Sequence, residues 1–120
     1  MNENQDELRT AVEGRHYVRG VNLALSAGES EEVVRDLQRK ALWQTAAVFR
    51  NAAGTKTLAE QYGMSKKEVV DFLRQRCEEE RSKGNKKTLE PTFDNDTNQY
   101  LTFDEWLDRF VKKWGKLVTS

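Results

Sequence analysis

The chain has 120 residues, which is enough for one domain with a real core but not for two. Only 37% of the residues are hydrophobic and 33% are charged, and 20 basic residues balance 20 acidic ones, so no net charge draws the chain to nucleic acid or to an anionic membrane. Cys77 is the only cysteine, which excludes an internal disulfide, and no signal-like or membrane-length apolar run occurs, so we expect a cytoplasmic protein without a membrane partner.

The first predicted element is a helix that begins at Asp6, after a tail over residues 1–5 that we expect to be disordered. Gly14 and Gly20 weaken this helix, either because another backbone comes close or because the helix breaks there. The only histidine, His16, has no neighbours with which to build a metal site or a general base, so we expect it on the surface. One helical stripe carries the apolar and small residues Leu8, Ala11, Gly14, Val18, Val21 and Leu25.

A second helix is predicted from about residue 31 to about Asn51, and residues 51–54 are expected to end it. Either Ser26 with Glu29 or Ser30 alone can cap its start. We expect it to be the most buried element, because one side is apolar along its whole length. That side carries Val34, Leu37, Ala41, Thr45, Val48 and Phe49.

Residues 57–75 contain two helix starts. Thr57 with Glu60, and Ser65 with Glu68, each fit the capping box, in which a hydroxyl and a carboxylate satisfy backbone donors reciprocally. Gly63 stands where a short helix over 58–62 needs a left-handed residue to end. The pattern therefore predicts a short helix, a tight turn through residues 63–64 and a longer helix from residue 66.

This stretch resembles the helix-turn-helix of bacterial repressors, with Ala59 and Gly63 four residues apart and apolar positions to match. The resemblance implies DNA binding by the first turn of the second helix, with flanking residues on phosphates. Carboxylates near the same surface oppose phosphate binding unless a cap occupies them. The implied DNA-binding residues are Ser65, Lys66 and Lys67 at the groove and Arg74 at a deeper or phosphate contact.

Residues 82–92 are expected to form a flexible, basic loop, and residues 55–90 contain nine basic and seven acidic residues. Cys77 is expected to be a small packing residue, because no histidine stands near it to activate the thiol. A short extended pair fits near residues 88–101. Thr102 and Glu105 form a third capping box, and the helix that follows buries Phe103, Trp106, Leu107, Phe110 and Trp114.

Residues 94–105 resemble the calcium loop of an EF-hand. Asp94, Asp96 and Asn98 fall on positions one, three and five, Tyr100 on the carbonyl position seven, and Glu105 on the bidentate position twelve. The resemblance implies calcium as a ligand. It departs from the family where Gln99 replaces the turn glycine, where Pro91 leaves little room for an entering helix, and in having no partner loop. An Asx-rich turn before a capped helix explains the same residues without a metal.

The sequence thus predicts an all-α protein with a single helical domain over residues 1–120, made of about five helices and containing a helix-turn-helix corner. No nucleophile–base pair, zinc-ligand spacing or phosphate loop occurs, so we predict no enzyme. Two classes of function remain open: a DNA-binding regulator that acts as a homodimer, or a protein-interaction module or accessory subunit that does not bind nucleic acid. The predicted core consists of Val34, Leu37, Val48, Phe49, Leu58, Val69, Phe72, Phe103, Leu107 and Phe110.

Overall fold

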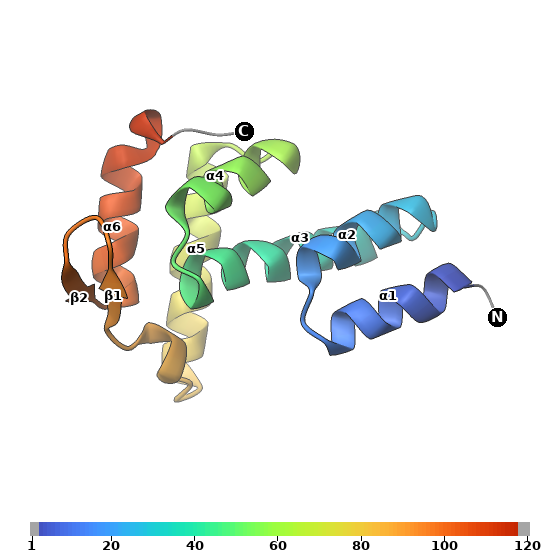
Figure 1. Cartoon of the computed structure of the whole chain (residues 1–120), viewed down its shortest axis with the longest axis horizontal. Helices are drawn as coiled ribbons and strands as arrows, with labels where there is room; N and C mark the ends of the chain where they lie inside the picture. Colours follow the sequence, from blue (N-terminus) through green and yellow to red (C-terminus); the bar gives the residue numbers. More distant parts are fainter. Residues whose placement is uncertain (1–2, 118–120) are drawn as a thin grey trace. The chain divides into compact units, whose positions relative to one another are not determined.

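The structure is a computed structural model that describes residues 3–117. Over these residues the chain forms six α-helices, three short helical segments of other types and one two-stranded sheet, which confirms the predicted all-α class (Figure 1). The chain divides into two compact units, residues 1–42 and residues 43–120, and each is described by itself. The expected single domain stays a prediction. Of the predicted disordered tail, residues 1–2 lie outside the described residues, whereas residues 3–5 are helical, so the prediction is wrong there.

The first unit contains α1 (Glu3–Glu13), α2 (Tyr17–Ser26) and most of α3 (Glu31–Trp43). The apolar stripe predicted from Asp6 is divided between two helices, because the chain breaks at residues 14–16, where Arg15 adopts a φ of 60°. At Gly20, by contrast, the atoms nearest to an added Cβ are side-chain carbons, the closest being one of Leu37 at 3.7 Å. Of the two explanations offered for the glycines, the helix break is therefore correct for Gly14.

The predicted helix from residue 31 starts as expected but changes its type before its end. Ser30 caps α3, since its Oγ accepts a hydrogen bond from the Val33 amide at 3.3 Å. After Trp43 the chain continues as the π-helix η1 (Gln44–Val48). A π turn holds an extra residue, which rotates the following residues away from the α-helical stripe. Val48 and Phe49 are consequently 50% and 63% exposed, so their assignment to the core is wrong.

The corner itself is built from α4 (Ala52–Gln61) and α5 (Lys66–Ser82). The predicted helix end at residues 51–54 is wrong, because the side chain of Asn51 caps α4 by accepting a hydrogen bond from the Gly54 amide at 2.9 Å. Asparagine is among the most favourable N-cap residues and only sometimes the residue that ends a helix. Thr57 therefore lies inside the helix and donates its hydroxyl to the Ala53 carbonyl, instead of starting a helix.

The remaining elements are η2 (Lys87–Leu89), β1 (Thr92–Asp94), β2 (Gln99–Leu101), α6 (Phe103–Lys113) and η3 (Trp114–Lys116). The predicted extended pair is confirmed: β1 and β2 are antiparallel, with Phe93 opposite Tyr100. The stretch predicted as a loop over residues 82–92 contains the 3-10 turn η2 and the start of β1.

Aromatic rings fill the core of the second unit. Trp106 lies between Phe103 and Phe110, with ring centroids 5.7 and 5.2 Å away, and Trp43 meets the edge of Phe103. On α5 the buried face carries Leu73, whereas Phe72 is only half-buried, which corrects the predicted core. The other predicted core residues are buried: Val34, Leu37, Leu58, Val69, Phe103, Leu107 and Phe110. None of the described helices has the length and apolar character needed to cross a membrane.

Candidate nucleic-acid interface

The corner between α4 and α5 is fixed by one backbone requirement and by its buried apolar side. Gly63 adopts a φ of 70°, and no atom lies within 4 Å of the position of an added Cβ, so backbone conformation and not crowding calls for glycine there. The Met64 amide donates to the Ala59 carbonyl at 2.8 Å, which closes the turn. Leu58, Ala59 and Val69 are buried on the inside of the corner. The first turn of α5 is thereby held on the surface.

The predicted DNA-contacting residues at the start of α5 are all exposed. Ser65 Oγ accepts a hydrogen bond from the Glu68 amide at 3.2 Å, and a Glu68 carboxylate oxygen accepts one from the Ser65 amide at 3.3 Å. This confirms the predicted capping box. It also engages the carboxylate of Glu68. Glu68 and Asp71 are the two acidic residues near this surface that oppose phosphate binding. Lys66 and Lys67 follow directly.

Two of the three predicted cations have acidic neighbours. The Lys67 ammonium lies 2.6 Å from Asp71, and this hydrogen bond raises the pKa of Lys67. Arg74 approaches Asp108 of α6 at 3.5 Å, whereas Lys66 makes no ion pair with any described residue. Exposed ion pairs of this kind contribute little to stability because solvent screens them, so they can be exchanged for other partners at little cost.

The residues predicted to hold calcium form a β-hairpin instead of a ligand cage. A carboxylate oxygen of Asp94 accepts hydrogen bonds from the amide and the hydroxyl of Thr97, at 2.9 and 2.8 Å, so the Asp94 side chain braces the turn. Asp96 pairs with Lys113, whose hydrogen bond lowers the pKa of Asp96. Asn98 takes the left-handed position, with a φ of 56°. The polar side chains of the turn are therefore used within the fold.

The last two predicted calcium ligands are also placed apart from a common site. Tyr100 is 69% exposed and packs against Phe93, and Glu105 accepts a hydrogen bond from the Thr102 amide at 2.9 Å in the predicted capping box. Among residues 3–117, no three histidine, cysteine, aspartate or glutamate side chains gather as metal ligands. The structure thus does not bring the predicted set together, and a hairpin turn braced by Asp94 before a capped helix accounts for the geometry.

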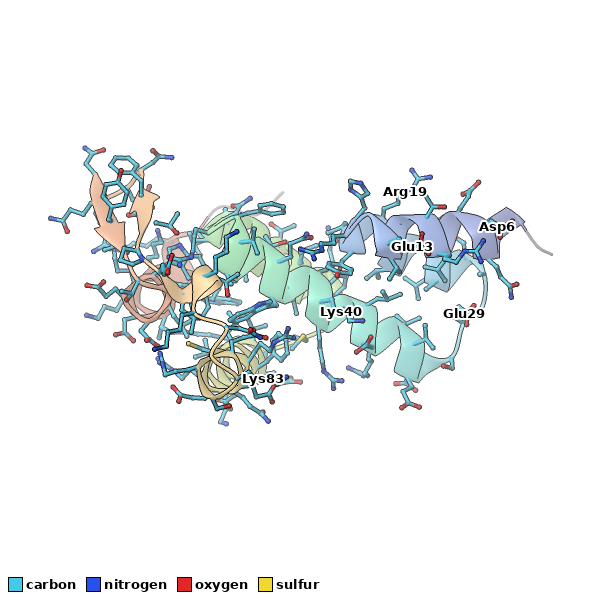
Figure 2. All side chains as sticks on the ribbon, turned by 90° about the horizontal axis from the view of Figure 1, so that it is seen from below. Asp6, Glu13, Arg19, Glu29, Lys40 and Lys83 are labelled. Carbon is cyan, nitrogen blue, oxygen red and sulfur yellow. The ribbon has the colours of Figure 1, made fainter. Side chains whose placement is uncertain are left out.

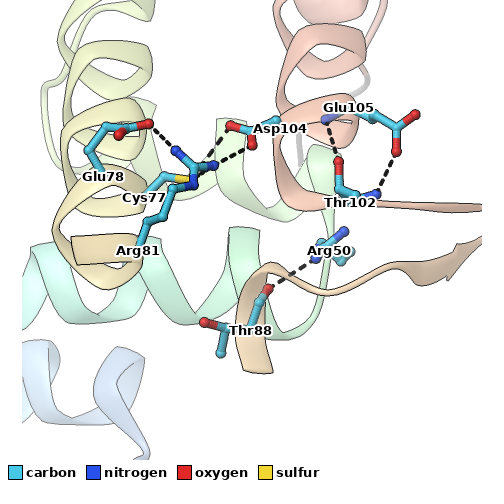
Figure 3. Close-up of polar contacts among 8 residues, drawn as sticks. All are labelled: Arg50, Cys77, Glu78, Arg81, Thr88, Thr102, Asp104 and Glu105. Carbon is cyan, nitrogen blue, oxygen red and sulfur yellow. Dashed lines mark hydrogen bonds and ion pairs between the residues drawn. The ribbon is translucent and has the colours of Figure 1, made fainter. Parts of the chain in front are cut away.

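The only cysteine lies in a polar cluster between α5 and α6 (Figure 3). Arg81 bridges the carboxylates of Glu78 and Asp104 beside the Cys77 thiol. Burial, with Asp104 adding to it, raises the pKa of Cys77 to about 11. The thiol is therefore protonated at neutral pH, and the cluster does not activate a nucleophile.

The sequence analysis did not single out Arg50, which links several segments of the second unit. Its backbone is left-handed, with a φ of 51°, and its guanidinium donates to carbonyls of Ala47, Thr88, Glu90 and Leu101 at 2.9–3.1 Å. Burial lowers the pKa of Arg50, and its guanidinium lies over the Phe103 ring. Three of its four partners are 38, 40 and 51 residues away along the chain, so no local signal could have indicated this role.

Two open cavities lie away from the corner, and both mix charges of opposite sign. One of about 590 Å³ lies in the first unit, where Figure 2 labels Asp6 and Arg19 among its lining residues. The other, of about 380 Å³, lies between the end of α5, η2 and the start of α6, with Arg81, Lys86, Glu90 and Asp104 in its walls. Neither cavity carries a predicted site residue.

The comparisons with known proteins give no relative for this chain. No protein-family model matches it, and neither a curated protein nor a solved structure matches it. The likeness to a repressor helix-turn-helix therefore depends on the residues and geometry of the corner alone.

Proposed function

We propose that this chain is a small non-enzymatic DNA-binding protein that places the first two turns of α5 in the major groove of duplex DNA. The observation that carries the proposal is the corner. Gly63 in the left-handed backbone conformation and the N-cap Ser65 hold the first turn of a 17-residue helix on the surface. A helix presented by its N-terminal turns is how helix-turn-helix proteins reach base edges.

One face of α5 offers the side chains that such a contact needs. Residues 66, 67, 70, 71 and 74 lie within an arc of about 140° around the helix axis, so they share one face. Lys66, Lys67 and Arg74 supply donors, and the half-buried Val70 supplies an apolar surface that suits a thymine methyl group.

The charge balance of this face predicts weak binding to DNA of arbitrary sequence. Asp71 and Asp108 offset the charges of Lys67 and Arg74 toward a phosphate, whereas Lys66 makes no ion pair with a described residue. The number of counterions released is then small, and so is the dependence of affinity on salt.

The test is a fluorescence anisotropy titration of a labelled duplex of random sequence over a series of salt concentrations. We expect the logarithm of the affinity to fall linearly with the logarithm of the salt concentration. In the double variant Lys66→Ala, Lys67→Ala, binding should weaken, and the slope should decrease by about one for each removed lysine that binds a phosphate in the wild type. A lysine that contacts a base instead should, when removed, relax sequence preference.

The matched control is the double variant Lys83→Ala, Lys86→Ala, which removes two exposed lysines beyond the far end of α5 (Lys83 is labelled in Figure 2). Its binding should equal that of the wild type. No measurable binding of the duplex by the wild type at about 50 mM salt would remove the DNA-binding proposal. Loss of binding in the control variant alone would move the contact to the end of α5.

A second candidate, a protein-interaction module, is favoured by the exposed face of the β-hairpin. Phe93 and Tyr100 are 45% and 69% exposed, and their rings meet edge to face with centroids 5.4 Å apart. Exposed aromatic rings are enriched at protein interfaces. If the partner of this face is a second copy of the chain, sedimentation velocity shows concentration-dependent association, which the variant Phe93→Ser, Tyr100→Ser abolishes. A monomer at all concentrations would contradict self-association through the hairpin.

A further inference from the structure

The pair formed by Lys67 and Asp71 stands on the face of α5 that the proposed function turns toward the groove. The two residues are one helical turn apart, their charged atoms are 2.6 Å apart, and their side chains are 85% and 59% exposed. One of the three ammonium donors of Lys67 is used by Asp71, and a carboxylate can accept more than one hydrogen bond. The pair therefore presents donors and an acceptor side by side.

A G·C base pair offers the complementary pattern in the major groove. Guanine presents two adjacent acceptors, N7 and O6, and the cytosine next to them presents the N4 donor. An A·T pair presents a donor between two acceptors and a methyl group at its edge. On an A·T pair the ammonium group finds one acceptor, adenine N7, beside the N6 donor for the carboxylate, so the pair makes one hydrogen bond fewer than on G·C.

Phosphate is a poorer partner for the same pair. A phosphate can take the ammonium group of Lys67, but Asp71 is then left beside a negative backbone without a donor. Binding to DNA without a matching base pair is thereby penalised, which is how a repulsive group creates specificity.

We propose that Lys67 and Asp71 together recognise a G·C base pair, and that Asp71 weakens binding to DNA that lacks one. This inference rests on the proposed function of the corner. Asp71 is the specificity-determining residue in it, and Lys67 is its partner.

The experiment compares two labelled duplexes of equal length, one of alternating G·C and one of alternating A·T pairs, by fluorescence anisotropy at about 50 mM salt. The wild type should bind the G·C duplex at least about fivefold more tightly, the lower end of what one good side-chain contact to a base pair gives. Asp71→Ala should bind the A·T duplex more tightly than the wild type does and lose most of the preference.

The control is Glu79→Ala, which removes an exposed carboxylate from the same helix, nearer its end. It changes the net charge by the same amount and should keep the preference. Far-UV circular dichroism should show unchanged helix content in both variants, since both positions are exposed.

The outcomes separate the two proposals. Failure of the wild type to bind either duplex contradicts the proposed function of the corner. Binding of both duplexes with equal affinity, or an unchanged preference in Asp71→Ala, overturns the assignment to Lys67 and Asp71 and leaves DNA binding in place. A preference that disappears equally in Glu79→Ala would show an effect of net charge, which also overturns the assignment.

Discussion

At the scale of single residues, Tyr62 is where the fold leaves a polar group unsatisfied. Its hydroxyl oxygen is buried without a hydrogen-bond partner among the described residues, and burial raises the pKa of Tyr62 from 10.0 to about 12. Tyr62→Phe removes a desolvated hydroxyl and should increase the free energy of unfolding by about 1 kcal/mol at neutral pH. Urea unfolding followed by circular dichroism measures the change.

The raised pKa of Tyr62 also predicts how the effect of this substitution on stability changes with pH. Because the folded pKa is above the unfolded value, the contribution of neutral Tyr62 is fully present below pH 10 and is lost as pH rises toward 12. The advantage of Tyr62→Phe should therefore widen above pH 10. Tyr100→Phe is the matched control, since the Tyr100 side chain is exposed and should show no such effect. Equal stabilities of Tyr62→Phe and the wild type at both ends of the range would contradict the prediction.

Residues whose role depends on a few neighbours in sequence were predictable. Gly63 was placed at positive φ because a helix ended there, and Ser65 and Thr102 were identified as caps because a glutamate follows each by three residues. Thr57 shows where this reasoning fails. It has the same pattern with Glu60, but Asn51 caps the helix six residues earlier. The earlier cap gives a longer helix with more backbone hydrogen bonds, which favours it over the later one.

At the scale of elements, the periodicity of apolar residues predicted well which segments are helical, but predicted poorly where one helix ends and the next begins. The stripe from Leu8 to Leu25 fits one helix, yet the chain breaks between α1 and α2. The pattern does not reveal the break, because a turn of three or four residues keeps the same spacing of apolar positions. The stripe ending at Val48 fits an α-helix, yet η1 is a π-helix. An inserted residue changes the phase of everything after it, and nothing in the local sequence marks the insertion.

The same limit applies to the candidate site. The exposure of Lys66 and Lys67 follows from the corner and was predictable, whereas the contact of Arg74 with Asp108 joins α5 to α6 and depends on their packing. The residues predicted to bind calcium lie apart for a related reason. Local spacing matched a loop, but the chain pairs β1 with β2 and uses Asp96 in a contact with Lys113 of α6.

Arg50 is the element-scale feature with the largest expected effect on stability. It joins η1 to η2 and to the end of β2 by donating to backbone carbonyls of all three segments. Arg50→Met keeps a long apolar stem and removes every donor, so carbonyls in the half-buried junction lose their partners. We expect the free energy of unfolding to fall by about 2–4 kcal/mol, measured by urea unfolding.

The control for this change is Arg39→Met on α3, where the arginine is exposed and makes no ion pair with a described residue. Its stability should stay within about 0.5 kcal/mol of the wild type. Similar midpoints for Arg50→Met and Arg39→Met would show that the junction does not depend on the guanidinium.

At the scale of the whole molecule, balanced charge makes local pairing the main electrostatic contribution to stability. With 20 charges of each sign, no long-range repulsion opposes folding at neutral pH. The described residues instead contain pairs such as Arg76 with Glu80 at 2.9 Å, where the arginine also covers the Trp43 ring. Acid should therefore act by neutralising paired carboxylates one at a time.

Glu80 provides the sharpest test of this view, because its side chain is buried. Burial alone would raise the pKa of Glu80, but hydrogen bonds from Arg76 and Asn85 outweigh it and bring the pKa below the ordinary 4.5. A lowered folded pKa means that the contribution to stability is present above pH 4.5 and is lost as pH falls through the folded value. In urea unfolding at about pH 7 and about pH 3, Glu80→Gln should be less stable than the wild type at the higher pH and should lose less stability on acidification. Glu79→Gln, an exposed neighbour, should follow the wild type at both pH values, and parallel losses in wild type and Glu80→Gln would exclude Glu80 as a source of the acid sensitivity.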